Sequence, residues 1–262
     1  MLEEIVAYKR EETRQRREQY NVSELLQRIA RARPVRDFAA ALRQPGFALI
    51  SEVKYRSPSK GILRGDFDPV ELAFAYERGG AHAVSVLADS RYFGGGPFVV
   101  KQVANLAGLT LPVMYKDFVI DPWQVQEARA CGADAVLLIA RIQPPQQLRR
   151  LVEQCRELAM CPLVECFDER DIAAALDSGT GVVGINNRDL GHFGVDFSRT
   201  ERLHALLPGS VLAVTESGLV DRAAVLRMQG LGFHAALVGE ALVSAPAPAH
   251  AVAMLLGRKE GT

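Results

Sequence analysis

The chain has 262 residues, 48% of them hydrophobic, and its 31 lysines and arginines balance 31 aspartates and glutamates. A chain of zero net charge lacks the basic excess of nucleic-acid-binding proteins, and no apolar run approaches the ~20 residues of a membrane helix. The charged N-terminus also lacks the apolar core of a signal peptide. We therefore expect a soluble cytoplasmic protein, monomeric or a weak homo-oligomer, with no nucleic acid or membrane partner.

The N-terminal segment is predicted to form a helical extension. Residues 2–20 and 23–33 are highly charged with helical patterns, and Ser23 is the expected N-cap of the second helix. The first helix carries only a narrow apolar stripe, which includes Ile5 and Val6. Such a helix is either solvated on the surface or packed over one end of the domain. We expect the second arrangement.

From residue 48 onward, short β-branched and apolar segments recur eight times, separated by helical patterns. Strict alternation of strand and helix indicates a parallel sheet, and eight units indicate a closed (β/α)8 TIM barrel. An open doubly wound sheet is the alternative, but the sequence has no GxGxxG fingerprint. The predicted strands are 48–55, 82–89, 112–118, 135–141, 162–167, 182–189, 210–217 and 235–242.

Helical patterns between these strands begin near Pro or Asp, and several end in Gly. No internal domain boundary is evident. We therefore expect one barrel domain over residues 1–262, with 1–45 as its N-terminal helical extension. The predicted helices are 69–80, 121–132, 144–159, 169–179 and 221–230.

The four cysteines include no CxxC pair. Cys161 and Cys166 lie on one predicted strand, and their odd separation places them on opposite faces, where they cannot hold a metal together. We expect buried thiols in a reducing compartment and no metal site.

Polar residues occur at the carboxyl ends of five predicted strands, where the active site of such a barrel lies. Each is in phase with apolar residues two and four positions earlier, which would fill the barrel core. We therefore expect these side chains at the barrel mouth, either as structural ion pairs or as a proton-transfer cluster whose members shift each other's pKa. They are Glu52, Lys54, Lys116, Glu165, Asn186, Arg188 and Glu216.

Two glycine-containing turns predict a phosphate site. Gly218 follows the seventh strand and Gly239 the eighth, and backbone N–H groups at these loops can approach an anion. We expect the backbone N–H of Glu240 to contribute and its side chain to point away from the anion. The SPSKG loop after the first strand is either an ordinary surface loop or a mobile loop whose Ser57 and Lys60 meet the substrate's charge.

In these residues the chain resembles the indole-3-glycerol phosphate synthase family of tryptophan biosynthesis. The resemblance covers essentially the whole chain, and KDFxxDPxQ, GINNRDL and ESG in this order are highly specific. The matching segments are EVKYRSPSKG, DFDPVELAFAYERGGAHAVSVL, PVMYKDFVIDPWQVQEARACGADAVLLIAR, LVECFDERD, GINNRDL, TESGL and LVGEAL.

The resemblance implies a carboxy-lyase that needs no metal or organic cofactor. Its substrate would be 1-(2-carboxyphenylamino)-1-deoxyribulose 5-phosphate, which is closed to an indole ring with loss of carbon dioxide and water. Lys116 would be the general acid that protonates the substrate's ketone, and Glu165 the catalytic carboxylate. Glu52 and Lys54 would serve carboxylate binding, charge stabilisation and dehydration.

The resemblance also implies residues around this catalytic group. The supporting residues are Asn186, Arg188, Glu216 and Ser217. The phosphate and anion contacts are Ser57, Gly218, Gly239 and the backbone of Glu240. An apolar wall for the aromatic ring is predicted from Phe93, Phe118 and Leu137. The chain departs from the family pattern at Ala88, Phe167 and Ala236, which affects the expected pocket shape more than the reaction type.

Two other functions stay open at this stage. An isomerase acting on a phosphorylated sugar would use the same barrel but would leave the aromatic wall idle. A non-catalytic barrel that binds a phosphorylated ligand or a partner protein would be expected to have lost a catalytic position, whereas Lys54, Lys116 and Glu165 are all present.

Overall fold

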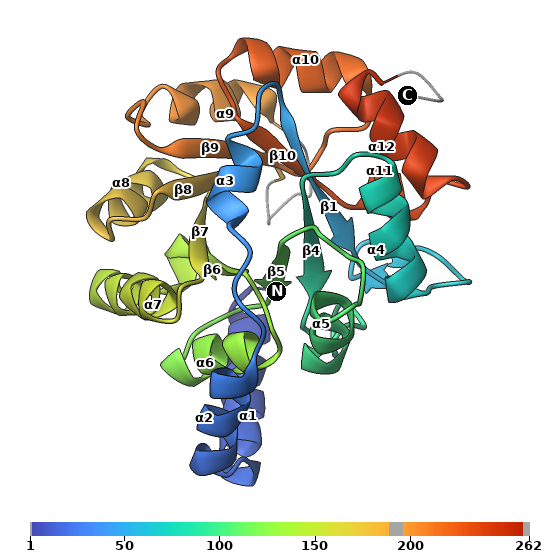
Figure 1. Cartoon of the computed structure of the whole chain (residues 1–262). Helices are drawn as coiled ribbons and strands as arrows, with labels where there is room; N and C mark the ends of the chain where they lie inside the picture. Colours follow the sequence, from blue (N-terminus) through green and yellow to red (C-terminus); the bar gives the residue numbers. More distant parts are fainter. Residues whose placement is uncertain (1, 189–195, 259–262) are drawn as a thin grey trace.

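Eight parallel strands close into a barrel in the computed structural model, which describes residues 2–188 and 196–258. Their order around the barrel is β1-β10-β9-β8-β7-β6-β5-β4, and Figure 1 shows the ring they form. The strands are β1 (Ala48–Val53), β4 (Ala83–Leu87), β5 (Val113–Lys116), β6 (Ala135–Ile139), β7 (Cys161–Cys166), β8 (Val182–Asn186), β9 (Leu212–Glu216) and β10 (Ala235–Val238). The predicted (β/α)8 barrel is confirmed.

Helices surround the strands on the outside of the ring (Figure 1). Aspartate side chains cap several helix N-termini by accepting backbone N–H bonds, as Asp68 does for Val70 and Glu71. The helices are α4 (Pro69–Arg78), α5 (Pro97–Ala104), α6 (Pro122–Ala130), α7 (Pro145–Glu157), α8 (Glu169–Asp177), α9 (Phe197–His204), α10 (Arg222–Gly230), α11 (Glu240–Val243) and α12 (Pro248–Leu256), with a 3₁₀ turn at Ala140–Ile142.

The inside of the barrel is filled by alternate residues of the strands, as the period of two requires. One buried cluster contains Ile50, Met114, Leu163 and Val214, two residues before the polar positions at the strand ends. The predicted phase of these strands is therefore confirmed. Residues of the opposite phase pack against the helices, so Cys166 joins the outer cluster while Cys161 packs against the inner one.

The N-terminal segment runs from one end of the barrel to the other. Helix α1 (Leu2–Gln19) reaches the carboxyl ends of the strands, α2 (Val22–Arg31) packs against α6, and α3 (Phe38–Leu42) brings Phe38 and Leu42 into the inner cluster. The cap of α2 differs from the expectation, because the Asn21 side chain accepts from the Ser23 N–H.

A short antiparallel hairpin was not predicted. It consists of β2 (Arg56–Ser57) and β3 (Gly61–Ile62), which flank the SPSKG loop after β1. Strands of two residues are too short to show a period of two in the sequence. Over the described part of the chain, no helix is both long and apolar enough to cross a membrane.

Candidate active site

A cavity of about 370 Å³ opens at the carboxyl ends of the strands. Every predicted site residue except Leu137 and Lys60 lines it. Helix α1 covers part of it with Leu2 and Ile5, so the expected lid is confirmed for this helix but not for α2. The predicted residues that line the cavity are Glu52, Lys54, Ser57, Phe93, Lys116, Phe118, Glu165, Asn186, Arg188, Glu216, Ser217, Gly218, Gly239 and Glu240.

Leu137 lies deeper than predicted. Its side chain is 1% exposed within the inner cluster, and Ile139, two residues further along β6, lines the cavity instead. Both residues face inward because of the period of two, but β6 continues one inward position beyond Leu137 before it ends. The pocket wall therefore contains Ile139, with Phe167 from the end of β7.

Glu52 is the centre of the charged cluster. Its carboxylate accepts a hydrogen bond from the Lys54 ammonium, and its second oxygen lies 3.6 Å from the Lys116 Nζ. Burial opposes ionisation of Glu52, but the two ammonium groups outweigh burial and lower its pKa. Glu52 is therefore a buried carboxylate that stays charged.

Lys116 lies among three carboxyl groups. Burial by itself would lower the pKa of its ammonium, yet Glu52, Glu165 and Glu216 together raise it. The group consequently stays protonated and has a proton to give. A half-buried ammonium that holds a proton at the cavity is suited to act as a general acid.

Glu165 and Glu216 differ in their surroundings. The Asn186 side chain donates to Glu165 Oε2 at 3.1 Å, whereas Glu216 Oε1 is buried with no hydrogen-bond partner among the described residues. Burial, reinforced by the nearby Glu165 charge, raises the pKa of Glu216 well above its usual value. Glu216 is thus driven toward its protonated form, the form that a general acid needs.

Two glycines make room for these carboxylates. A Cβ on Gly184 of β8 would overlap Glu216 Oε1, and a Cβ on Gly239 would overlap Glu52 Oε1. The same added carbon would lie 2.9 Å from Leu163 at the first position and 3.0 Å from the Lys54 Nζ at the second. The cluster therefore depends on the absence of these two side chains.

The loop after β9 has the backbone expected of an anion site. Ser217 and Gly218 have φ angles of 68° and 82°, in the left-handed region that a non-glycine residue seldom adopts. The buried Asn187 holds this loop, since its amide donates to Ser217 O at 2.6 Å and to Thr215 Oγ1 at 2.9 Å. Successive backbone N–H groups in such a turn converge on an anion.

Asn187 was not predicted. Its neighbours Asn186 and Arg188 have the inward phase, whereas Asn187 points outward, where it also accepts from the Thr200 hydroxyl of α9. A polar residue on the outward phase of a buried strand end was the signal that could have identified it. Asp189 and Leu190, which complete the GINNRDL motif, lie outside the described residues.

Two basic side chains lie near Glu240, the first residue of α11. Glu240 lies 3.7 Å from the Lys60 Nζ and 3.6 Å from the Arg188 guanidinium, so its charge is shared between two cations. The hairpin β2–β3 positions Lys60, whose N–H donates to Ser57 Oγ at 3.3 Å. The orientation of Glu240 relative to a bound anion stays a prediction.

Aromatic side chains form one wall. The rings of Phe93 and Phe118 are 6.2 Å apart between centroids and inclined by 34°. The cavity thus combines an apolar side with a charged floor and two loops of anion-binding character. Among the described residues, no group of three or more His, Cys, Asp or Glu side chains has the arrangement of a metal site.

Comparison with known proteins identifies the family. A sequence profile described as indole-3-glycerol phosphate synthase matches residues 2–255. Indole-3-glycerol phosphate synthase 2 of Streptomyces coelicolor is 44% identical over 253 residues, covering 97% of each chain. The enzyme of a Roseiflexus species is 43% identical over 94% of each chain.

Solved structures show the fold alone. A thiamine phosphate pyrophosphorylase from Pyrococcus furiosus superimposes with a TM-score of 0.60 at 16% identity, over 80% of this chain and 93% of its own. The family assignment rests on the sequence profile and the relatives, and the arrangement of side chains around the cavity agrees with it. The chain belongs to the indole-3-glycerol phosphate synthase family, carboxy-lyases of tryptophan biosynthesis.

Proposed function

We propose that the chain closes the indole ring of indole-3-glycerol phosphate from 1-(2-carboxyphenylamino)-1-deoxyribulose 5-phosphate, with Lys116 as the first proton donor. The observation that carries this assignment of roles is the position of Lys116 with Glu52, Glu165 and Glu216 around one cavity of about 370 Å³, where these carboxylates raise its pKa. That volume is in the range of pockets that enclose a small ligand.

The first half of the reaction needs an acid. Lys116 protonates the ketone oxygen of the substrate while the ring carbon that bears the carboxylate attacks the ketone carbon. The new carbon–carbon bond interrupts the aromatic ring. Loss of carbon dioxide returns the electrons of the broken bond to the ring and restores its aromaticity. The protein contributes position and a proton, because the ring supplies the driving force.

The second half of the reaction expels water. The hydroxyl group formed in the first half is protonated and leaves, and a proton is removed from the neighbouring nitrogen or carbon. Lys54, Glu52 and Glu165 are the groups at the barrel mouth that can donate and accept these protons. Glu216 and Asn186 support them by setting charge and orientation.

The substrate's two anionic ends have separate places. The phosphate lies in the cradle of Ser217, Gly218 and Gly239 with the Ser57 hydroxyl, and the aryl carboxylate lies toward Lys54. The ring contacts Phe93 and Phe118. In support, the two loops and the aromatic wall line different sides of one cavity.

Replacement of Lys116 tests this assignment. We expect Lys116→Ala to lower kcat by roughly 10²-fold or more, the usual effect of removing an acid–base group, with the fold intact. Indole fluorescence measures product formation, and circular dichroism checks the fold. The exposed Lys101→Ala serves as the control of equal charge change. Unchanged turnover in Lys116→Ala would remove this residue from the mechanism.

We also infer that residues 1–262 act as one domain with 1–45 as its extension, as a monomer or weak homo-oligomer in the cytoplasm. The contribution of Leu2 and Ile5 to the cavity supports a functional link between extension and barrel. The four free cysteines agree with a reducing compartment.

A further inference from the structure

Lys9 of α1 is a fully buried lysine outside the catalytic cluster. Its side chain is 0% exposed, and lysine is seldom buried to this degree unless it is paired. Its Nζ lies 2.6 Å from Glu12, 2.9 Å from Asp117 and 3.0 Å from Asp89. One ammonium therefore joins a carboxylate of its own helix to two carboxylates of the barrel.

The two barrel aspartates fix the loops that carry the aromatic wall. Asp89 Oδ1 accepts the backbone N–H of Tyr92 at 2.6 Å and that of Phe93 at 3.2 Å. Asp117 Oδ1 accepts the N–H of Phe118 at 2.9 Å. Each carboxylate thus holds the backbone of a wall residue with one oxygen. Each also lies within ion-pair distance of Lys9.

Lys9 also belongs to the helix that covers the cavity. Ile5 lies one turn before it on the same face of α1, and Ile5 lines the cavity together with Leu2. Elsewhere α1 is held by Arg16, which pairs with Glu127 of α6. The lid and the two wall loops therefore meet at one buried cation.

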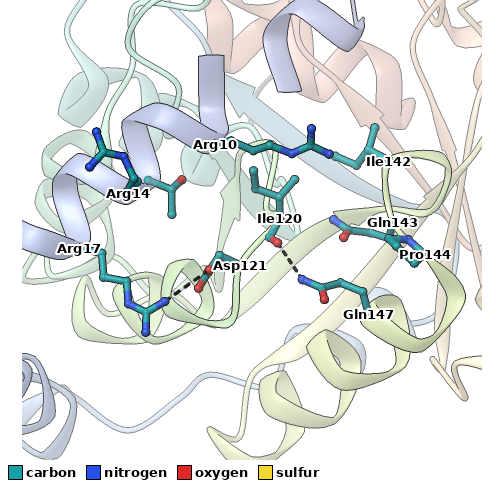
Figure 2. Close-up of a pocket in the computed structure, with 10 residues that line it drawn as sticks. Arg10, Arg14, Arg17, Ile120, Asp121, Ile142, Gln143, Pro144 and Gln147 are labelled. Carbon is teal, nitrogen blue, oxygen red and sulfur yellow. Dashed lines mark hydrogen bonds and ion pairs between the residues drawn. The ribbon is translucent and has the colours of Figure 1, made fainter. Parts of the chain in front are cut away.

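Another part of α1 is loosely packed. A second cavity, of about 390 Å³, lies between α1 and the loops after β5 and β6, and Figure 2 shows Arg10, Arg14 and Arg17 along it. The ion pair that bridges it joins Arg17 to Asp121 at 3.7 Å with the arginine well exposed. An exposed pair at this distance contributes little to docking.

We propose that Lys9 is a positioning residue that fastens α1 to the loops bearing Phe93 and Phe118, so that lid and wall enclose the aryl ring of the substrate together. The identity of the ring rests on the proposed function, whereas the docking of α1 does not. Without the ammonium, Asp89 and Asp117 are uncompensated buried charges close to each other. They are then expected to move toward solvent and to carry the wall with them.

The single tryptophan gives a readout of docking that needs no substrate. Trp123 of α6 is 6% exposed, with the Arg16 guanidinium 5.5 Å and the Tyr20 ring 5.5 Å from its ring centroid. We expect Lys9→Met to shift the emission of Trp123 to longer wavelength, because undocking of α1 uncovers the indole. The exposed Lys101→Met is the control and should leave the emission unchanged.

Steady-state kinetics give the second readout. Lys9→Met should raise KM about tenfold and lower kcat less than about threefold, because lid and wall bind the ring equally in ground and transition states. A lower Tm with KM and emission unchanged would show that Lys9 only stabilises the fold, and would overturn the proposal. A loss of kcat at constant KM would overturn it as well.

Asp89→Asn covers the case in which Lys9→Met does not fold. The amide oxygen of the new asparagine still accepts the N–H bonds of Tyr92 and Phe93, while the substitution removes the negative charge that faces Lys9. KM should therefore rise, but by a smaller factor than in Lys9→Met. An unchanged KM in this variant contradicts the proposal. If the wild-type chain forms no indole product, the proposed function fails, while the Trp123 emission still decides whether Lys9 docks α1.

Discussion

Glu52 and Glu216 are two buried carboxyl groups in the same mouth, and their surroundings move their pKa values in opposite directions. Burial disfavours the charge of both. For Glu52 the ammonium groups of Lys54 and Lys116 overcome burial and lower the pKa. For Glu216 burial and the charge of Glu165 prevail over Lys116 and raise the pKa. The sign of the pKa shift depends on the charges around the carboxyl group, not on depth alone.

Opposite pKa shifts predict opposite pH dependences of stability. Relative to the wild type, Glu52→Gln should lose stability above the ordinary carboxyl pKa of 4.5, and the loss should shrink as pH falls through the folded-state value. The stability that Glu216 gives the wild type is fully present below pH 4.5, the ordinary pKa of the group. This stability is lost as the pH rises through the raised pKa of the folded state. Glu216→Gln should therefore gain stability relative to the wild type as pH rises.

Urea unfolding at a series of pH values measures both differences. Each variant serves as the control for the other, because both substitutions remove one carboxylate from the same cavity. Differences that change in the same direction with pH would contradict the opposed shifts.

At the residue scale, the sequence predicts which side chains face the mouth but not their charge states. The period of two placed Glu52, Lys116 and Glu216 correctly. Protonation depends on distances between neighbouring strands, which no single strand encodes. The role of Lys9 was not predicted for a similar reason. Its partners Asp89 and Asp117 are 80 and 108 residues away in the sequence, so no local pattern connects them.

At the scale of elements, β8 leaves room for a carboxylate of β9 because it carries Gly184 on its inward face. The residue is register partner to Glu165 on one side and to Val214 on the other. The space of the missing side chain is occupied by the Glu216 carboxylate. A strand glycine here marks the close approach of a functional group.

Gly184→Ala is predicted to displace Glu216. We expect kcat to fall by about 10²-fold, because a misplacement near 1 Å at a catalytic group has effects of this size. The control is Gly181→Ala, where an added Cβ has no atom within 4 Å. Indole formation measures the rate. Equal kcat values for the two variants would show that Glu216 tolerates the shift.

Secondary-structure elements were predictable where the sequence has a periodic apolar pattern or a capping residue, and not where it has neither. The eight strands follow from runs of apolar residues, and helices such as α4 follow from start signals such as Asp68-Pro69. The hairpin β2–β3 is too short to have a pattern. Asn21, rather than the predicted Ser23, is the N-cap of α2, because the Asn21 side chain accepts the N–H of Ser23 two residues later.

At the scale of the whole molecule, the chemistry and a second anchor of the N-terminal segment lie at opposite ends of the barrel. The sequence predicted the mouth because ionisable residues gather there against the packing preference of a core. The anchor at the opposite end was not predicted, because it is an ion pair between Asp134 and Arg33, which are 101 residues apart in the sequence. The interior there is plugged by Phe38 and Leu42 of α3.

Asp134 is the centre of that anchor, at the start of β6. Its fully buried carboxylate accepts from Nη1 and Nη2 of the Arg33 guanidinium, at 2.8 and 2.6 Å. It also accepts the backbone N–H of Arg36 at 2.7 Å and that of Val113 at 2.8 Å. One side chain thus ties the N-terminal segment to two neighbouring strands.

Asp134→Ala should separate stability from activity. Because it leaves two N–H groups without their acceptor and the Arg33 guanidinium without its carboxylate partner, we expect a loss of about 3 kcal/mol in the free energy of unfolding. The value of kcat/KM should stay within about twofold of wild type, because catalysis takes place at the other end of the barrel. Asp177→Ala, which removes an exposed pair with Arg149, is the control and should cost less than about 1 kcal/mol. A fall in kcat/KM without a loss of stability would mean that the two ends are coupled.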